Sequence, residues 1–88
     1  MARYSLEIKP SASREIEGLP TKKERRLVVD RIFKLADNPR PPGSEKLSGE
    51  DKYRVRQGAY RIVYEIDDAK LAVRVVKVGH RREVYRRP

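Results

Sequence analysis

Cysteine is absent from the sequence, and its absence excludes disulfide bonds and metal sites built from thiolates. Histidine is almost absent too, and the single residue of this type, His80, argues against a histidine-based metal site. No apolar run reaches the length of a membrane span, and the first residues lack the apolar segment of a signal peptide. We therefore expect a soluble cytoplasmic protein with no metal, no other cofactor and no membrane partner.

Positive charge is abundant and unevenly distributed. The formal net charge is +9. Residues 1–51 carry 11 Lys/Arg against 9 Asp/Glu, whereas residues 52–88 carry 11 against 4. A positive field concentrated in one half of the chain is typical of a surface that binds a polyanion such as nucleic acid. Charge alone leaves a generally basic, soluble surface as an equal alternative.

The first part of the chain predicts one strand and two helices. Apolar residues alternate with polar ones over residues 4–8, which is the period of a half-buried strand. Ser11 is expected to cap a short helix that ends at Gly18. Thr21, with a glutamate three residues later, matches the capping box of a second helix, which Pro39 and the two residues before it stop. The second helix is expected to turn five apolar residues inward, namely Leu27, Val28, Ile32, Leu35 and Ala36, with Phe33 beside them.

The second half of the chain predicts three strands. After a loop over residues 40–49 that is rich in Pro, Gly and Ser, a two-residue period indicates strands at 53–57, 60–66 and 71–78. We expect an α+β fold in which these strands form an antiparallel meander and the N-terminal strand joins one edge. The helical hairpin then covers one face of the sheet. The 88 residues suffice for a single domain, 1–88.

Three arginines are expected on the other face of this sheet. Arg54 and Arg56 alternate with apolar residues on the first meander strand, and Arg61 lies on the next. They form one cationic patch if the pairing register brings Arg61 to the face of the other two. The guanidinium fork matches phosphate oxygens, which favours phosphate recognition. The alternative is a solvated face on which arginine stems cover apolar surface.

The C-terminal run carries the most specific signal. Residues 53–56 (YRVR), 58–66 (GAYRIVYEI) and 78–85 (VGHRREVY) together resemble the RelE branch of the RelE/ParE toxin superfamily. The resemblance covers essentially the whole chain, and its two halves are specific in combination. The sequence departs from the family pattern in two respects. The first-strand positions are often lysine in the family but are arginine here, and the segment between Gly79 and Tyr85 is short.

The resemblance implies a toxin of a type II toxin–antitoxin system that cleaves mRNA in the ribosomal A site. It implies a cognate antitoxin as partner, expected to be acidic and to fold on the toxin in a hetero-oligomer. Carried over by position, the catalytic residues are Arg56, Arg61, Arg81 and Tyr85. The expected RNA-binding residues are Lys52, Arg54, His80, Arg82 and Arg86.

The expected chemistry is metal-independent attack of the RNA 2′-hydroxyl on the adjacent phosphorus. Arg61 and Arg81 are expected to stabilise the charge of the transition state. The proton acceptor stays open, because arginine remains protonated in proteins. Tyr85 serves if neighbouring cations lower its pKa, and otherwise stacks on a base. His80 is a further candidate for proton transfer.

Three other functions remain open from the sequence. The ParE branch shares the fold and poisons DNA gyrase, but typically lacks the terminal arginine and tyrosine. A non-catalytic RNA-binding protein, or an inactive homologue that only binds an antitoxin, would keep the basic surface without the reaction.

Overall fold

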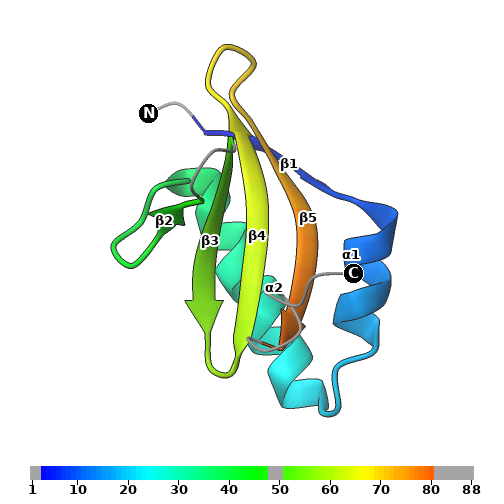
Figure 1. Ribbon diagram of the computed structural model, residues 1–88. Coiled ribbons are helices and arrows are strands. Elements are labelled where there is room, and N and C mark those ends of the chain that lie inside the picture. Colours follow the sequence, from blue (N-terminus) through cyan, green and yellow to red (C-terminus); the bar gives the residue numbers. More distant parts are fainter. Residues whose placement is uncertain (1–2, 48–50, 81–88) are drawn as a thin grey trace.

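The computed structural model describes residues 3–47 and 51–80 as a five-stranded sheet with two helices on one face (Figure 1). The elements are β1 (Ser5–Ile8), α1 (Pro10–Glu17), α2 (Lys22–Asp37), β2 (Glu45–Lys46), β3 (Lys52–Gln57), β4 (Tyr60–Asp67) and β5 (Ala72–His80). The strand order is β1-β5-β4-β3-β2. The predicted α+β class, helical hairpin and antiparallel meander β3–β4–β5 are confirmed. No helix in the described part of the chain is long and apolar enough to cross a membrane.

Strand β1 lies at the edge of the sheet, as predicted, and runs parallel to β5. Leu6 and Ile8 alternate towards the core opposite Val73 and Val75. Beyond Ile8 the outer edge of β5 is no longer paired with β1. There Glu15 of α1 contacts the strand edge instead. Its carboxylate accepts a hydrogen bond from the backbone N–H of Val78 at 2.9 Å and lies 2.8 Å from Lys77 Nζ. The first helix therefore completes the edge that the first strand leaves open.

The two helices begin at different kinds of residue. Helix α1 starts at Pro10, one residue before the predicted cap, so the prediction of Ser11 as the cap was wrong. Proline suits the first turn because its missing N–H would have no partner there. Helix α2 starts as predicted after Thr21, whose hydroxyl oxygen accepts the backbone N–H of Glu24 at 3.1 Å.

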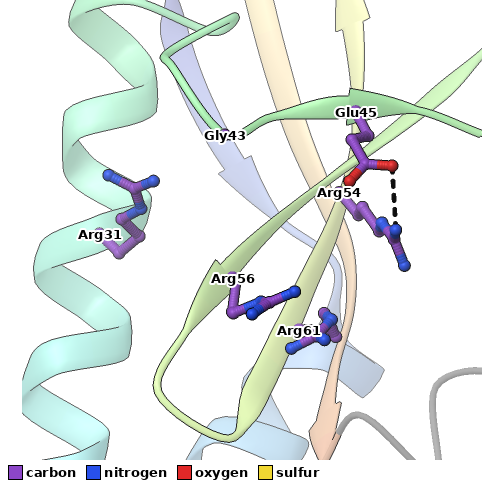
Figure 2. Close-up of a pocket in the computed structure, with 6 residues that line it drawn as sticks. All are labelled: Arg31, Gly43, Glu45, Arg54, Arg56 and Arg61. Atoms are coloured by element: carbon purple, nitrogen blue, oxygen red, sulfur yellow. Dashed lines mark hydrogen bonds and ion pairs between the residues drawn. The ribbon is translucent and has the colours of Figure 1, made fainter.

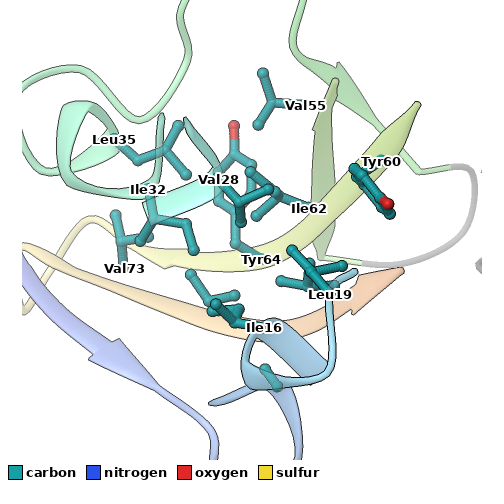
Figure 3. Packing of buried hydrophobic residues seen from close by; sticks show 13 residues of the cluster. Ile16, Leu19, Val28, Ile32, Leu35, Val55, Tyr60, Ile62, Tyr64 and Val73 are labelled. Atoms are coloured by element: carbon teal, nitrogen blue, oxygen red, sulfur yellow. The ribbon is translucent and has the colours of Figure 1, made fainter. Parts of the chain in front are cut away.

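The core lies between α1, α2 and the inner face of the sheet (Figure 3). Four of the five α2 residues predicted to point inward are buried: Val28, Ile32, Leu35 and Ala36. Leu27 is 41% exposed, so its predicted inward position was wrong, and Phe33, expected beside the inward residues, is 53% exposed. The residues at 28, 32, 35 and 36 form one stripe along a helix with 3.6 residues per turn, and 27 and 33 fall on its two flanks.

The predicted loop at residues 40–49 contains a short strand that the sequence did not indicate. Strand β2 pairs with β3 so that Glu45 lies opposite Arg54 and Lys46 opposite Tyr53. Residues 48–50 lie outside the described part of the chain. The pairing lays this segment along β3 and brings a carboxylate beside the predicted arginines.

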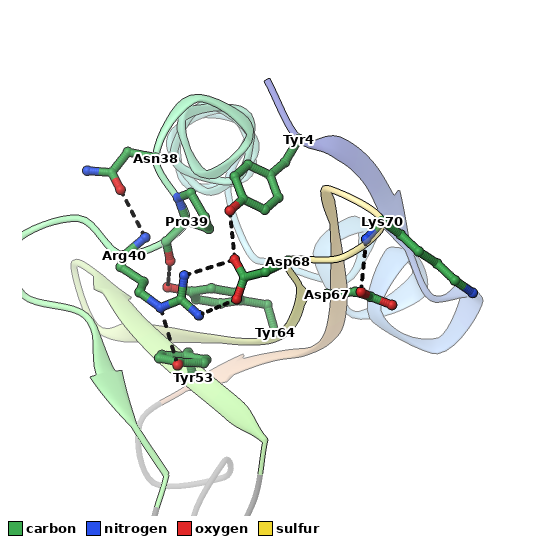
Figure 4. Close-up of polar contacts among 9 residues, drawn as sticks. All are labelled: Tyr4, Asn38, Pro39, Arg40, Tyr53, Tyr64, Asp67, Asp68 and Lys70. Atoms are coloured by element: carbon green, nitrogen blue, oxygen red, sulfur yellow. Dashed lines mark hydrogen bonds and ion pairs between the residues drawn. The ribbon is translucent and has the colours of Figure 1, made fainter. Parts of the chain in front are cut away.

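A polar cluster joins the N-terminus, the 38–44 loop and the β4–β5 turn (Figure 4). Arg40 donates to both carboxylate oxygens of Asp68, at 3.2 and 2.9 Å, and Tyr4 donates its hydroxyl to the same group at 2.7 Å. The guanidinium of Arg40 also lies 5.2 Å above the ring of Tyr53. We call these four residues the Arg40–Asp68 clamp.

Tyr64 anchors the same loop from inside the core. Its hydroxyl donates to the carbonyl of Pro39 at 2.7 Å, and both groups are buried. Burial raises the pKa of the Tyr64 hydroxyl above its usual value, so this donor stays protonated. The loop that carries β2 is thus held to the sheet at its beginning.

Candidate functional site

The β3–β4 hairpin sets the positions of the predicted arginines. Its turn has two residues, and the first, Gly58, has a φ of +60°, which glycine adopts without strain. A two-residue turn leaves one pairing register, and that register places Arg56 directly opposite Arg61. Arg54 lies two residues along the same face. The condition for a single cationic patch is therefore met.

Arg61 is enclosed on the outer face of the sheet. On its other side it faces Gly79 of β5, which has no side chain. The residue is only 7% exposed, an unusual position for a charged side chain on a small sheet. Arg61 is consequently held on a rigid strand between another arginine and a glycine.

A cleft of about 290 Å³ opens over these residues (Figure 2). It is lined by Arg31, Gly43, Glu45, Arg54, Arg56 and Arg61, and we call this set the arginine cleft. The walls come from α2, the loop before β2, β2 itself and the β3–β4 hairpin. Four guanidinium groups and one carboxylate therefore meet in one small cavity, which suits it to an anion.

The single carboxylate of the described lining is paired with one of the arginines. Arg54 donates to Glu45 Oε2 at 3.0 Å, and the Glu45 side chain remains 63% exposed. This pair is solvent-accessible, so it contributes little to stability. Its chemical significance is that a proton-accepting group lies among cations.

The structure brings together three of the sequence-predicted site residues, Arg54, Arg56 and Arg61. Lys52 lies on the same face of β3, opposite Glu65, and does not line the cleft. His80 lies opposite Tyr60 with their rings edge-to-face at 6.1 Å, which places it on the helix side of the sheet. It lines a separate cavity of about 340 Å³ beside α1.

The other four predicted site residues lie outside the described part of the chain: Arg81, Arg82, Tyr85 and Arg86. Their predicted roles in catalysis and RNA binding stay predictions. Among the residues that are described, no three His, Asp or Glu side chains gather as metal ligands would.

Two residues of the cleft were missed from the sequence, Arg31 and Glu45. Arg31 is one of several charged residues on the polar side of α2, and the helical period does not distinguish it from the others. Glu45 lies in a segment whose composition predicts a loop. The sequence around it has no strand period that would indicate its pairing opposite Arg54. Only the tertiary arrangement of α2 and β2 against β3 reveals both.

Comparison with known proteins gives consistent relatives along the whole chain. A family model for the ParE toxin of the type II toxin–antitoxin system parDE matches residues 6–85. Toxin RelG of Mycobacterium tuberculosis is 30% identical over 87 residues, covering 96% of this chain and 98% of that protein.

Solved structures extend the likeness to the fold. A chain of the toxin–antitoxin complex RelBE2 from Mycobacterium tuberculosis superposes with a TM-score of 0.81 at 30% identity, covering 92% of this chain and 94% of that chain. A doubly substituted form of the E. coli toxin RelE in the free state superposes with a TM-score of 0.77 at 30% identity, covering 94% and 90%. The likeness thus includes the hairpin that bears the arginines.

Proposed function

This chain belongs to the RelE/ParE superfamily as a RelE-like toxin of a type II toxin–antitoxin system, and from that premise we propose that it cleaves mRNA on the ribosome. The reaction is transfer of the phosphoryl group to the RNA's own 2′-hydroxyl. A bond forms between the 2′-oxygen and phosphorus while the bond to the 5′-oxygen breaks. The products are a 2′,3′-cyclic phosphate and a 5′-hydroxyl.

The observation that carries the proposal is the arginine cleft. In-line attack at phosphorus builds negative charge on the non-bridging oxygens, and preorganised cations lower the barrier by stabilising that charge. Arg56 and Arg61 lie opposite each other on adjacent strands, so the hairpin backbone brings both cations together before substrate arrives. Arg54 lies beside them and is oriented by Glu45.

Glu45 is the proton acceptor that the described cleft offers. Removal of the 2′-hydroxyl proton needs a base, and the guanidinium groups around it cannot serve because they stay protonated. A carboxylate bonded to Arg54 can take that proton. We propose that Tyr85 donates the leaving-group proton and that Arg81 adds charge stabilisation, as the resemblance implies for Arg81. His80, the other candidate for proton transfer, lies in a separate cavity.

Ribosome dependence follows from the modest chemistry of the cleft. A carboxylate and several arginines form a weak acid–base system, so correct positioning of the mRNA must supply much of the rate enhancement. The ribosome positions the codon in the A site. The basic surface of the chain then binds ribosomal RNA, with an affinity that falls as salt rises.

A cognate antitoxin is the protein partner in this proposal. Solved relatives include RelBE toxin–antitoxin complexes from Mycobacterium tuberculosis and E. coli. An excess of guanidinium groups in the cleft attracts acidic segments, so an acidic antitoxin neutralises the toxin by covering the cleft or by holding it off the ribosome. The pair then forms a hetero-oligomer.

Primer-extension mapping of mRNA in cells that express the chain tests the proposal. We expect cuts within translated codons that disappear when translation is blocked, and no cuts with Arg61→Ala. The match to the ParE family model favours gyrase inhibition as the second candidate. Double-strand breaks in DNA with intact mRNA would establish that candidate instead, and growth without arrest would indicate an inactive homologue.

A further inference from the structure

Arg31 enters the arginine cleft from a different element than the other arginines. It stands on α2, whereas Arg54, Arg56 and Arg61 stand on β3 and β4. Figure 2 shows Arg31 apart from Arg56 and Arg61, with the Gly43 segment above the gap. The cleft therefore has a helical wall with its own cation.

The guanidinium of Arg31 is incompletely satisfied by the protein. Its Nε is buried and has no hydrogen-bond acceptor among residues 3–47 and 51–80. A buried donor without a partner costs free energy, and most native donors of this kind have one. Arg25, six residues earlier on α2, has such a partner, since its Nη1 donates to the carbonyl of Leu19 at 2.8 Å.

The charge of Arg31 is not neutralised by its described surroundings. Burial raises the pKa of the Tyr64 hydroxyl, and the positive charge of Arg31 opposes that rise. Tyr64 is itself fixed by Pro39, beneath the loop that leads to Gly43. Arg31 forms no ion pair with the residues that the structure describes. Its charge remains available to a ligand in the cleft.

The size of the cleft suits more than a single ion. Its volume of about 290 Å³ is close to the lower limit of ligand pockets, roughly 300 Å³. A dinucleotide segment of single-stranded RNA carries consecutive phosphates on a continuous backbone. Cations on two separate walls match two such phosphates better than one, because each wall then contacts its own group.

We propose that Arg31 binds the RNA phosphate next to the scissile one, so that the cleft holds two consecutive phosphates. The inference rests on the proposed ribonuclease function and assigns Arg31 a positioning role: it aligns the backbone while the strand arginines act at the reacting phosphorus. The ligand class is single-stranded RNA, recognised through its backbone.

Binding of a short single-stranded RNA with 2′-O-methyl groups throughout tests the contact without cleavage. We expect Arg31→Ala to weaken binding roughly tenfold. We also expect the slope of log K against log salt to fall by roughly 0.7, the value for one phosphate of a single strand. Arg26→Ala is the matched control, because Arg26 is exposed on the same helix and outside the cleft. Equal losses for the two variants, or no binding by the wild type, would overturn the proposal.

Neutral methylphosphonate linkages placed one at a time along the RNA locate the contact. When the linkage that Arg31 contacts is already neutral, Arg31→Ala should not weaken RNA binding any further, whereas it should weaken binding with the neutral linkage at any other position. Arg61→Ala should show the same behaviour at the neighbouring linkage. The proposal is contradicted if both variants become silent at the same linkage, or if Arg31→Ala weakens binding equally at every linkage. Unfolding temperatures of Arg31→Ala and Arg31→Gln that match the wild type show that the loss is not structural.

The same assay separates this inference from the proposed function. If Arg54→Ala and Arg56→Ala weaken RNA binding and Arg31→Ala does not, the cleft binds RNA and only the role of Arg31 is wrong. If none of the three variants changes binding, the cleft is not an RNA site, and the proposed function fails with it.

Discussion

The arginine cleft and the Arg40–Asp68 clamp lie towards opposite ends of the β3–β4 hairpin and use arginine for different purposes. Arg40 donates to one carboxylate through both of its terminal nitrogens, Nη1 and Nη2, and an aromatic ring lies beneath it. The cleft gathers four guanidinium groups around one carboxylate. Balanced charge fixes a loop to a sheet, whereas an excess of one sign in a cavity favours a ligand of the other sign.

The electrostatics of Asp68 make the same point. The hydrogen bond from Arg40, followed by that from Tyr4, lowers the pKa of Asp68 to about 2. The same carboxylate raises the pKa of Tyr4 and of Arg40. Each group of the clamp thus stabilises the charge state of its neighbour. Changes in the cleft should therefore affect activity, whereas changes near the clamp should affect stability.

Loss of the cleft carboxylate should have the largest effect. Glu45→Gln removes the proposed base while keeping the shape of the side chain, so the single-turnover rate of mRNA cleavage on programmed ribosomes should fall roughly 10²- to 10⁴-fold. RNA binding should strengthen, because one negative charge leaves the cleft. Glu65→Gln, on the same face of the sheet but outside the cleft, should cleave normally. An unchanged rate for Glu45→Gln would rule out this base.

Loss of Arg61 should cost nearly as much. Arg61→Ala removes about 2–4 kcal/mol of transition-state stabilisation, which corresponds to a fall of roughly 30- to 900-fold in cleavage rate. Arg74→Ala is the matched control, because Arg74 lies on the outer face of β5 and is paired with Glu7 at 3.3 Å and Glu65 at 4.0 Å. Thermal unfolding must show that both variants fold. Equal rates in the two variants would mean that the outer face acts only through its total charge.

Near the clamp, Tyr64→Phe should affect stability and leave the cleavage rate unchanged. The variant leaves the buried Pro39 carbonyl without its donor, which costs about 1–2 kcal/mol of unfolding free energy. The melting temperature should then fall by roughly 4–15 °C. Tyr53→Phe removes a more exposed hydroxyl, 3.3 Å from Arg40 Nε, and should cost less. A cleavage defect in Tyr64→Phe at a temperature where it is folded would show that the two regions are coupled.

The smallest effect is expected from acid titration of the clamp. Because the folded pKa of Asp68 is about 2 and its ordinary value is 3.8, its contribution is fully present above pH 3.8 and is lost as the pH falls towards 2. Asp68→Asn should show a shallower decline of urea stability over that interval. The pair is exposed, so solvent screening keeps the difference small. Parallel declines for variant and wild type would show that Asp68 contributes nothing to acid stability.

The sequence predicted the hairpin and its arginine face because both depend on local rules. A two-residue turn and strict alternation determine which side chains of β3 and β4 share a face, so Arg54, Arg56 and Arg61 could be grouped in advance. The walls of the cleft depend on long-range packing. The helical period indicates which residues of α2 are buried, but only the packing of α2 beside the loop before β2 decides that Arg31 lines the cleft.

The position of His80 shows how one irregularity changes such a prediction. Alternation from Val73 and Val75 would put His80 on the arginine face. The register between β4 and β5 shifts at Val63 and Tyr64, so that Val76 has no partner and the following residues change sides. Val78 consequently enters the core, and His80 packs against Tyr60. A bulge of this kind has no signature in the sequence.

The hairpin that carries three of the cleft arginines also has a consequence for the order of folding. Five of the six residues that line the cleft lie between positions 43 and 61, whereas the clamp joins Tyr4 and Asp68 across 64 positions of sequence. Closing a short loop costs less entropy than closing a long one, and non-local pairing slows folding. During synthesis β1 must also wait for β5 before the sheet can close. We therefore expect the cationic hairpin to form first, on a chain whose edges are still open, so that an acidic partner can already bind the emerging toxin.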